Sequence, residues 1–429
     1  MYANSSVAKG HGVGDCRPAD LGSQSTVFSD LIGERSIAGE TSACRIARYI
    51  EQEIVAGGIS VDDNWGSEKA LAARFGVSRS IMRQAGRVLE IRGVARMQRG
   101  PKGGLKVLAL DHECSADIIT YHMRLFAPTP ADIDAAQLVL EEIAKKLARK
   151  ASYLDEIGSS YGQQKDVVDF YLRIVNSLKT DAITRSSRQE SSSVQLYDLF
   201  RRTRAGQIVK RMMSEYSPQD WVEGRRLGSE EELCEKYAAD RDVFRQVVRI
   251  FESTGAAKSV CGRGNGLVSQ APRLGATCRL IACDLAIYGI EPDSVFDLFN
   301  YLSVQTAGIA AARATSEDRE KIEDALARFA AAIDGNGMDQ QSAALFKVEE
   351  CLYSVAGNPI ILLFLLGTKG FSASNVSRTQ IEAAHMNQKF LECTRQVVEA
   401  LRRNDPFGAM RAQYRKNIVL SSPFIGRSR

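Results

Sequence analysis

Residues 66–93 read GSEKALAARFGVSRSIMRQAGRVLEIRG, and this stretch decides the fold. Ser67 can cap a short helix, because its hydroxyl can accept a hydrogen bond from a backbone amide of the first turn, and Gly76 ends that helix. Ser78 can cap a second helix, in which the apolar residues recur at helical spacing. The stretch therefore predicts two helices joined by a tight turn, the arrangement of a helix-turn-helix.

The outer face of the second predicted helix is basic. Arg79, Arg83 and Arg87 stand at positions i, i+4 and i+8, within about 80° of arc on an α-helix. Such a helix fits the major groove of DNA, where arginine can bind guanine O6 and N7 and where phosphates line both edges. Three arginines alone are more typical of a solvated helix face. The capped helices, the glycine turn and the hairpin that follows favour DNA binding because they occur together in this order.

A glycine-rich hairpin follows the basic helix. Residues 95–99 and 105–108 are predicted to form its two strands. Arg99 and Lys102 stand near its tip, from which a cationic side chain can reach the minor groove or the phosphates. Residues 41–110 are therefore predicted to form a winged helix-turn-helix that binds double-stranded DNA.

The same pattern occurs a second time, 162 residues later and without a gap, so that residues 66–105 align with residues 228–267. Chance does not keep a gapless register over so long a stretch. The predicted fold class is mainly α, with two winged helix-turn-helix domains that carry small β wings and alternate with all-helical bundles, the first bundle being shortened. The expected domains are a mobile tail at 1–40, the first winged unit at 41–110, the shortened helical domain and linker at 111–190, the second winged unit at 194–272 and the long helical domain at 276–422.

The two copies differ in charge. Residues 43–108 hold 12 Lys and Arg against 6 Asp and Glu, whereas residues 205–270 hold 10 against 10. A carboxylate near a phosphate is repelled, and each lost cation reduces the release of counterions on binding. We therefore predict that the first copy supplies most of the affinity, and that the second binds weakly, reads a different half-site or only supports assembly. The second copy keeps Arg241, Arg245 and Arg249, but it has Glu231 in place of Lys69, Asp240 in place of Ser78, Asp242 in place of Ser80 and Cys261 in place of Arg99.

The first copy resembles the N-terminal domain of the GntR superfamily of bacterial regulators. The resemblance rests on an SE-x-x-L-A stretch at residues 67–72 and on GVSR-x-x-x-R at residues 76–83. It implies a sequence-specific transcription regulator that binds an operator, and we interpret it as a repressor. Lys69 replaces the usual arginine, which keeps the charge but loses the planar guanidinium fork. The positions that match the family's DNA contacts are Lys69, Ser78, Arg79, Ser80, Arg83, Arg99 and Gly100.

Residues 291–420 resemble the helical ligand-binding domain of the FadR branch of this superfamily, called FCD. The resemblance runs through residues 298–314, the Ala-Gly-Asn-Pro turn at 356–359 and residues 400–405. It implies a bundle that binds a small organic effector, with a carboxylate as one option. Pocket walls of apolar residues with a few polar groups would suffice for such a ligand.

Many FCD domains hold a metal with one Asp and three His, and this chain departs from that set. Leu345 stands at the Asp position and Glu349 at the first His, and the later His positions fall near Thr394 and Lys416. We therefore expect no metal and no cofactor. Arg313 and Glu349 are the candidates for contacting an organic effector, although residues of these types are more often surface ion-pair partners.

The remaining features bear on class and compartment. The chain has nine cysteines without a CxxC pair and no apolar stretch near the roughly 20 residues of a membrane span, which favours a cytoplasmic protein of the bacterial nucleoid with no membrane partner. It has no P-loop, GxSxG, HExxH or Rossmann fingerprint, so we predict that it is not an enzyme.

Two alternatives and one question of assembly stay open. The chain could be an assembly protein whose second module contacts protein, or a redox sensor that uses Cys278 with Cys283, or Cys261. Most relatives by resemblance bind two-fold symmetric sites as dimers. We therefore expect either a homodimer or an intramolecular pseudo-dimer of the two modules.

Overall fold

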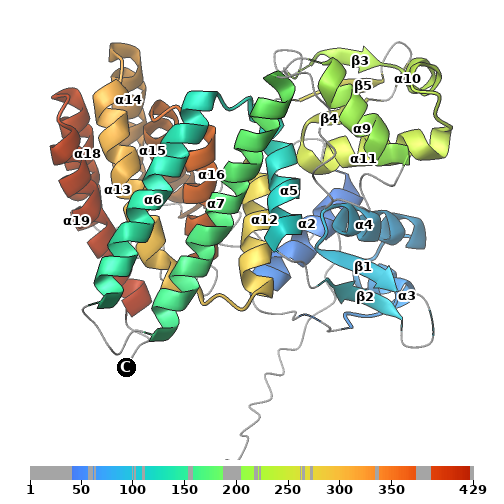
Figure 1. Ribbon diagram of the computed structural model, residues 1–429, viewed down its shortest axis with the longest axis horizontal. Helices are drawn as coiled ribbons and strands as arrows, with labels where there is room; N and C mark the ends of the chain where they lie inside the picture. Colours follow the sequence, from blue (N-terminus) through green and yellow to red (C-terminus); the bar gives the residue numbers. More distant parts are fainter. Residues whose placement is uncertain are drawn as a thin grey trace, which may run out of the picture.

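The computed structural model has two small winged units at one end and a helical bundle at the other (Figure 1). In the part of the chain that the structure describes, no helix is both long and apolar enough to cross a membrane. The described residues are 41–56, 61, 64–98, 100, 103–108, 112–152, 158–186, 204–216, 221, 224–260, 262, 266–270, 274–333, 338–372 and 388–425.

The first unit has the elements that the sequence predicts. Ser67 Oγ accepts a hydrogen bond from Ala70 N at 3.2 Å, and Ser78 Oγ accepts one from Ile81 N at 3.3 Å. Both predicted caps are therefore confirmed, and each places a helix start where a side chain satisfies an otherwise free amide. The unit consists of α2 (Ser42–Val55), α3 (Glu68–Arg74), α4 (Arg79–Ile91), β1 (Ala95–Gln98) and β2 (Gly104–Val107).

Residues 204–269 form the same elements in the same order. The starts of α2 and α9, of α4 and α11, and of β1 and β4 are each 162 residues apart. The second hairpin carries an additional strand at its edge, in the order β3-β5-β4. The elements are α9 (Arg204–Glu215), β3 (Arg226–Gly228), α10 (Glu230–Lys236), α11 (Arg241–Thr254), β4 (Ala257–Ser259) and β5 (Leu267–Ser269).

A glycine at the same place in both units brings the hairpin against the segment before the short helix. Gly104 has φ +157°, and a Cβ built there would lie 2.7 Å from Gly66 O. Gly266 has φ +156°, and its Cβ would lie 2.7 Å from Ser229 Cα. Only glycine permits this approach, because any side chain would collide with backbone and the backbone angle itself disfavours one.

The helical segments on either side of the second unit pack together. The sequence placed residues 111–190 in a shortened helical domain of its own, but their buried side chains belong to the same apolar core as those of the C-terminal helices. Three helices are too few to enclose an apolar core alone, so they use the larger bundle. The helices are α5 (His112–Met123) with the 3₁₀ turn η2 (Arg124–Phe126), α6 (Pro130–Ser152), α7 (Gly158–Ser186), α12 (Leu274–Ile287), α13 (Pro292–Arg313), α14 (Ser316–Ile333), α15 (Met338–Val355), α16 (Pro359–Ser372), α18 (Gln388–Arg402) and α19 (Pro406–Ile425).

A buried ion cluster joins the first winged unit to the bundle. Glu51 on α2 accepts hydrogen bonds from Arg92 Nη1 at 2.6 Å and from Arg279 Nε on α12 at 3.0 Å. The side chains of these three residues are at most 4% exposed. A charge removed from water to this degree is tolerated only where an opposite charge compensates it. The position of the first unit on α12 therefore depends on this carboxylate.

His122 on α5 is buried close to this cluster and gives the protein a pH dependence. Burial, assisted by the charge of Arg92, lowers the pKa of His122 from 6.5 to about 3. Between these values the unfolded chain binds a proton that the folded chain excludes, so stability falls as the pH drops below 6.5.

The His122→Gln variant is expected to lose less stability than the wild type as the pH falls from 7 to 5, because glutamine does not titrate. Urea unfolding of both proteins at several pH values in this range checks the prediction, since most carboxylates stay charged there. Parallel pH curves for the two proteins would contradict it.

Candidate nucleic-acid interface and effector site

The exposed face of α4 carries the arginines that the sequence singled out. Arg79, Arg83 and Arg87 are exposed, whereas Met82 and Leu89 on the opposite face are buried in the core. Of the other predicted contacts, Lys69, Ser78, Ser80 and Gly100 are also exposed. Arg99 and Lys102 at the tip of the wing lie outside the described residues. The described part of the predicted interface is therefore accessible from solvent.

Arg83 has a partner that sequence reasoning missed. Its guanidinium donates to Glu68 at 2.9 and 3.2 Å in a two-pronged contact, which raises the pKa of Arg83. Glu68 lies in the first turn of α3, and the acid at the equivalent position of the second unit is Glu230, which lies 3.8 Å from Arg245. The recurrence of both acid and arginine at an offset of 162 was the signal that could have revealed this pair. The contact orients the arginine before any DNA is bound.

The second unit presents acids beside its arginines. Arg245 lies 3.7 Å from Asp242 as well as near Glu230, and the Asp242 side chain is 89% exposed. Glu231 and Asp240 are exposed on the same side of the unit. Asp240 also caps α11, accepting from Val243 N at 2.8 Å. These acids are compatible with folding, but they place negative charge where the first unit has neutral or basic residues.

Arg249 has a different environment from Arg87, its counterpart in the first unit. Helices α4 and α11 contact each other, and Arg249 is only partly exposed near that contact. Burial and the charge of Arg87 lower the pKa of Arg249. The third arginine of the second unit therefore lies at the junction of the two units, a position that depends on their packing and has no local sequence signal.

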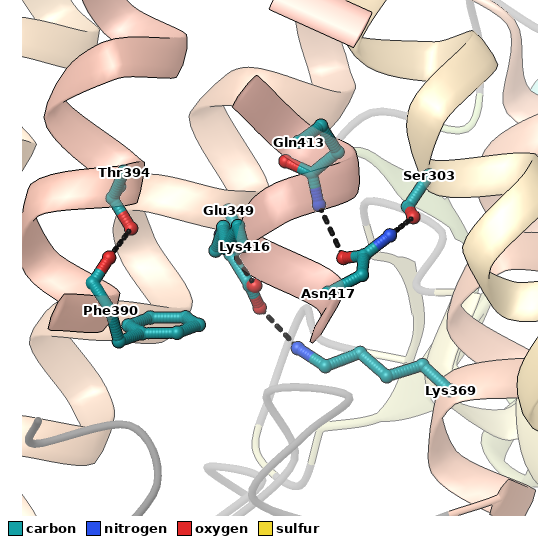
Figure 2. A network of polar contacts seen from close by, with 8 residues as sticks. All are labelled: Ser303, Glu349, Lys369, Phe390, Thr394, Gln413, Lys416 and Asn417. Carbon is teal, nitrogen blue, oxygen red and sulfur yellow. Dashed lines mark hydrogen bonds and ion pairs between the residues drawn. The ribbon is translucent and has the colours of Figure 1, made fainter. Parts of the chain in front are cut away.

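The bundle holds a buried ion cluster around Glu349. The Glu349 carboxylate accepts hydrogen bonds from Lys369 on α16 and, at 3.1 Å, from Lys416 on α19 (Figure 2). The three side chains are at most 7% exposed. Lys416 Nζ also lies 4.9 Å from the centre of the Phe390 ring. Lys369 follows the apolar run of α16, where a single lysine was a signal that sequence reasoning passed over.

A ladder of uncharged polar groups lies beside this ion cluster. Asn417 Nδ2 donates to Ser303 Oγ at 2.8 Å, and Gln413 Nε2 donates to Asn417 Oδ1 at 2.9 Å (Figure 2). Burial and the neighbouring Glu349 raise the pKa of Tyr353, so its hydroxyl stays protonated. An apolar core with this many buried polar groups is unusual unless the groups have a binding or orienting role.

Arg313, the other effector candidate, has a structural contact. Its Nη1 donates to Ala356 O at 2.9 Å and so holds the Ala-Gly-Asn-Pro turn at the start of α16. Asn358 in the same turn caps α16 by accepting from Ile360 N and Ile361 N at 3.0 and 3.1 Å. Arg313 and Glu349 therefore have different partners, and Glu349 alone belongs to the buried cluster.

The side chains at the family's metal positions do not fit a divalent cation. Leu345 is buried and apolar, and the Thr394 hydroxyl donates to Phe390 O at 2.9 Å. Glu349 already neutralises two lysines, and the Lys416 ammonium would repel a cation. Among the described residues, no group of three or more His, Cys, Asp or Glu is arranged to hold a metal.

The cysteines proposed for redox sensing are deeply buried in the bundle. Burial raises the pKa values of Cys278 and Cys283 well above that of a free thiol. Because the thiolate is the reactive form, this environment disfavours oxidation of either residue. Cys261, at the second wing, lies outside the described residues.

Comparison with known proteins agrees with this division of the chain. Residues 43–104 match the model of the bacterial regulatory proteins of the gntR family, and residues 294–415 match that of the FCD domain. The Uxu operon regulator of Haemophilus influenzae is 24% identical over 158 residues, which are 34% of this chain and 58% of that relative. The chain thus spans less than two thirds of that relative's length.

Two solved structures are similar to about half of the chain. Streptococcus agalactiae GntR is 18% identical, with a TM-score of 0.38, and covers 50% of this chain and 98% of its own. E. coli McbR/YncC is 16% identical, with a TM-score of 0.27, and covers 50% of this chain and 95% of its own. The two domain matches carry the assignment: this chain is a DNA-binding GntR-type transcription regulator with an FCD domain.

Proposed function

We propose that this regulator binds a specific operator mainly through α3, α4 and the wing of its first unit, and that it acts as a repressor. The observation that carries the proposal is the exposed basic face of α4, in the unit that matches the gntR-family model. Arg79, Arg83 and Arg87 would supply base or phosphate contacts, with Lys69, Ser78 and Ser80 beside them.

The second unit, in this proposal, is a winged helix-turn-helix with weakened DNA contacts. Its matching element order supports a common fold, and its exposed acids support the loss of affinity. The same acids favour a second candidate function for this unit, which is contact with another protein. Binding of operator DNA by a variant that lacks the arginines of the first unit would argue for DNA contact by the second.

The test of the function is genomic footprinting of the tagged protein, followed by binding of the recovered fragments in vitro. We expect a small set of promoter-proximal sites that share a sequence, and binding that weakens steeply with salt. Deletion of the gene is expected to raise transcription at those promoters. Uniform recovery of the genome, or fragments that fail to bind the purified protein, would argue against an operator-binding regulator.

The effector, in the same proposal, is a small organic anion that binds at the Glu349 cluster without a metal. One carboxylate faces two ammonium groups there, so the cluster has an excess of positive charge if both lysines are protonated. Burial lowers the pKa of Lys416, and Glu349 opposes that effect. A second carboxylate would satisfy the remaining ammonium, which makes anions the class of ligand that this site favours.

In a thermal-shift assay with millimolar acetate, lactate, malate and citrate, at least one acid is expected to raise the unfolding temperature above that in chloride of equal ionic strength. The rise should persist in EDTA, because no metal takes part, and it should vanish in Lys416→Met. The control is Lys347→Met, which removes an exposed lysine near the start of the same contact helix and should respond like the wild type. A rise that requires a divalent metal, a full response of Lys416→Met, or no rise with any acid would contradict the prediction.

A further inference from the structure

Equivalent helices of the two halves of the chain contact each other. Helices α5 and α12 begin 162 residues apart, as do α6 and α13, and as do α4 and α11 of the winged units. In each of these three pairs the two members are packed against one another. Contact between the same element of two copies is the signature of a two-fold, self-complementary interface.

The third helix of each half extends the same symmetry. Helix α7 packs against α5 and α6 of its own half, and α16 packs against α12 and α13 of its own half. Each also crosses to the other half, since α7 contacts α13 and α16 contacts α6. These contacts are reciprocal, as they are between the subunits of a symmetric dimer. Figure 1 shows α6 and α7 lying along the C-terminal bundle beside α13 and α16.

The polar contacts across this interface are reciprocal as well. Asn358 Nδ2, at the start of α16, donates to Asp132 O at 2.8 Å. On the other side, Ser294 Oγ donates to Gln163 Oε1, near the start of α7, at 2.8 Å. Asp132 and Ser294 are themselves equivalent, at an offset of 162. The amide of one half therefore binds the same helix start in the other half, in both directions.

The centre of the interface is closely packed. The rings of Tyr171 and Phe364 stack with centroids 4.2 Å apart and an angle of 8° between their planes. The hydroxyls of Tyr171 and Thr368 are hydrogen bonded at 2.8 Å, and both residues are fully buried. A buried polar contact within an aromatic stack requires a well-defined packing geometry, which is typical of a permanent interface.

We propose that the N-terminal half occupies, within one chain, the place of a second subunit, so that a single chain is the complete DNA-binding assembly. The faces of α12, α13 and α16 that a second copy would need are covered by α5, α6 and α7. The protein is then a monomer that reads one operator with two unequal half-sites. The DNA part of this inference rests on the proposed function, whereas the monomer does not.

The two halves divide the functions between them. The half with the basic DNA unit has three long helices after it, within residues 112–186, whereas the other half continues through α14, α15, α18 and α19. Glu349 and Lys416 lie on α15 and α19, which have no counterpart among those three helices. One assembly therefore has a single effector site for two DNA units. Its response to an effector should follow a simple one-site curve, with a Hill coefficient of one.

The test is the mass of the full chain in solution and on DNA. Light scattering after size exclusion is expected to give 47.1 kDa across micromolar concentrations, and one chain per operator duplex. A mass of twice that value, or two chains on one operator, would overturn the proposal. If the protein binds no DNA, the proposed function fails while the mass of the free chain still decides whether the assembly is complete in one chain.

A crosslink distinguishes this interface from an exchange of halves between two chains. The photoreactive amino acid p-benzoylphenylalanine is introduced in place of Tyr171, against Phe364 of α16. Irradiation is expected to join α7 to α16 within a band of monomer mass, identified by peptide mass spectrometry. The same substitution at exposed Tyr414 is the control and should not produce that crosslink. A crosslinked band of dimer mass from position 171 would overturn the proposal.

Discussion

Replacing Arg79 by alanine is expected to weaken operator binding by about ten- to a hundredfold, whereas replacing Arg241 should weaken it by no more than about threefold. A bidentate arginine contact to guanine contributes about 1–3 kcal/mol of discrimination, which corresponds to the first range. Arg79 and Arg241 occupy the same first position of α4 and α11. The difference between them is expected from their surroundings, since Arg79 is flanked by Ser78 and Ser80 and Arg241 by Asp240 and Asp242.

The measurement is fluorescence anisotropy with a labelled operator at a fixed salt concentration, repeated over a salt series. Loss of a phosphate contact lowers the salt slope by about one, whereas loss of a base contact relaxes sequence preference, so the series separates the two roles of Arg79. The control is Arg328→Ala, on α14 at the opposite end of the molecule (Figure 1). Equal losses for Arg79→Ala and Arg241→Ala would refute the asymmetry between the two units.

Replacing Glu51 by glutamine is expected to destabilise the fold by about 3–5 kcal/mol, because it removes the carboxylate that two buried guanidinium groups share. Arg279 is affected most directly, since burial lowers its pKa to about 10 already and the Glu51 carboxylate accepts from its Nε. Cys283 Sγ lies 3.6 Å from Glu51 O, so α2 and α12 are also joined through the backbone. The substitution should therefore loosen the first unit from the bundle before the bundle itself unfolds.

Urea unfolding and limited proteolysis measure the two parts of this prediction. The midpoint of unfolding should fall, and cleavage should concentrate in the first unit. The matched control is Glu142→Gln, in an ion pair with Lys145 whose side chains are about 60% exposed, and it should leave the midpoint unchanged. If Glu51→Gln unfolds like this control, the buried cluster does not hold the first unit in place.

Local signals in the sequence were sufficient for the first unit. Ser67, Gly76 and Ser78 define the turn between α3 and α4 through contacts within four residues of one another, so they act wherever the segment is placed. The 162-residue repeat likewise predicted where the elements of residues 204–269 begin. The roles of the individual arginines in DNA contact stay predictions, because they concern a partner.

Contacts between distant segments could not be found in this way. Glu51 and Arg279 are 228 residues apart, and Glu349 and Lys416 are 67 apart. In the sequence each is an ordinary charged residue on a helix, and surface ion pairing is the more common environment for such residues. Packing alone made them buried partners.

The sequence by itself determined the kind of unit that this protein contains and how its two copies differ, because helix caps, helical periodicity and local charge depend only on neighbouring residues. It also excluded the family's metal ligands, since their residue types are missing from the aligned positions. Only the tertiary structure decided that α5, α6 and α7 lie against α12, α13 and α16, that Arg249 lies between the two winged units, and that Glu349 lies between two lysines. The physical reason is that burial of apolar surface has no direction along the chain, so which faces meet is settled by how the complete set of helices packs together.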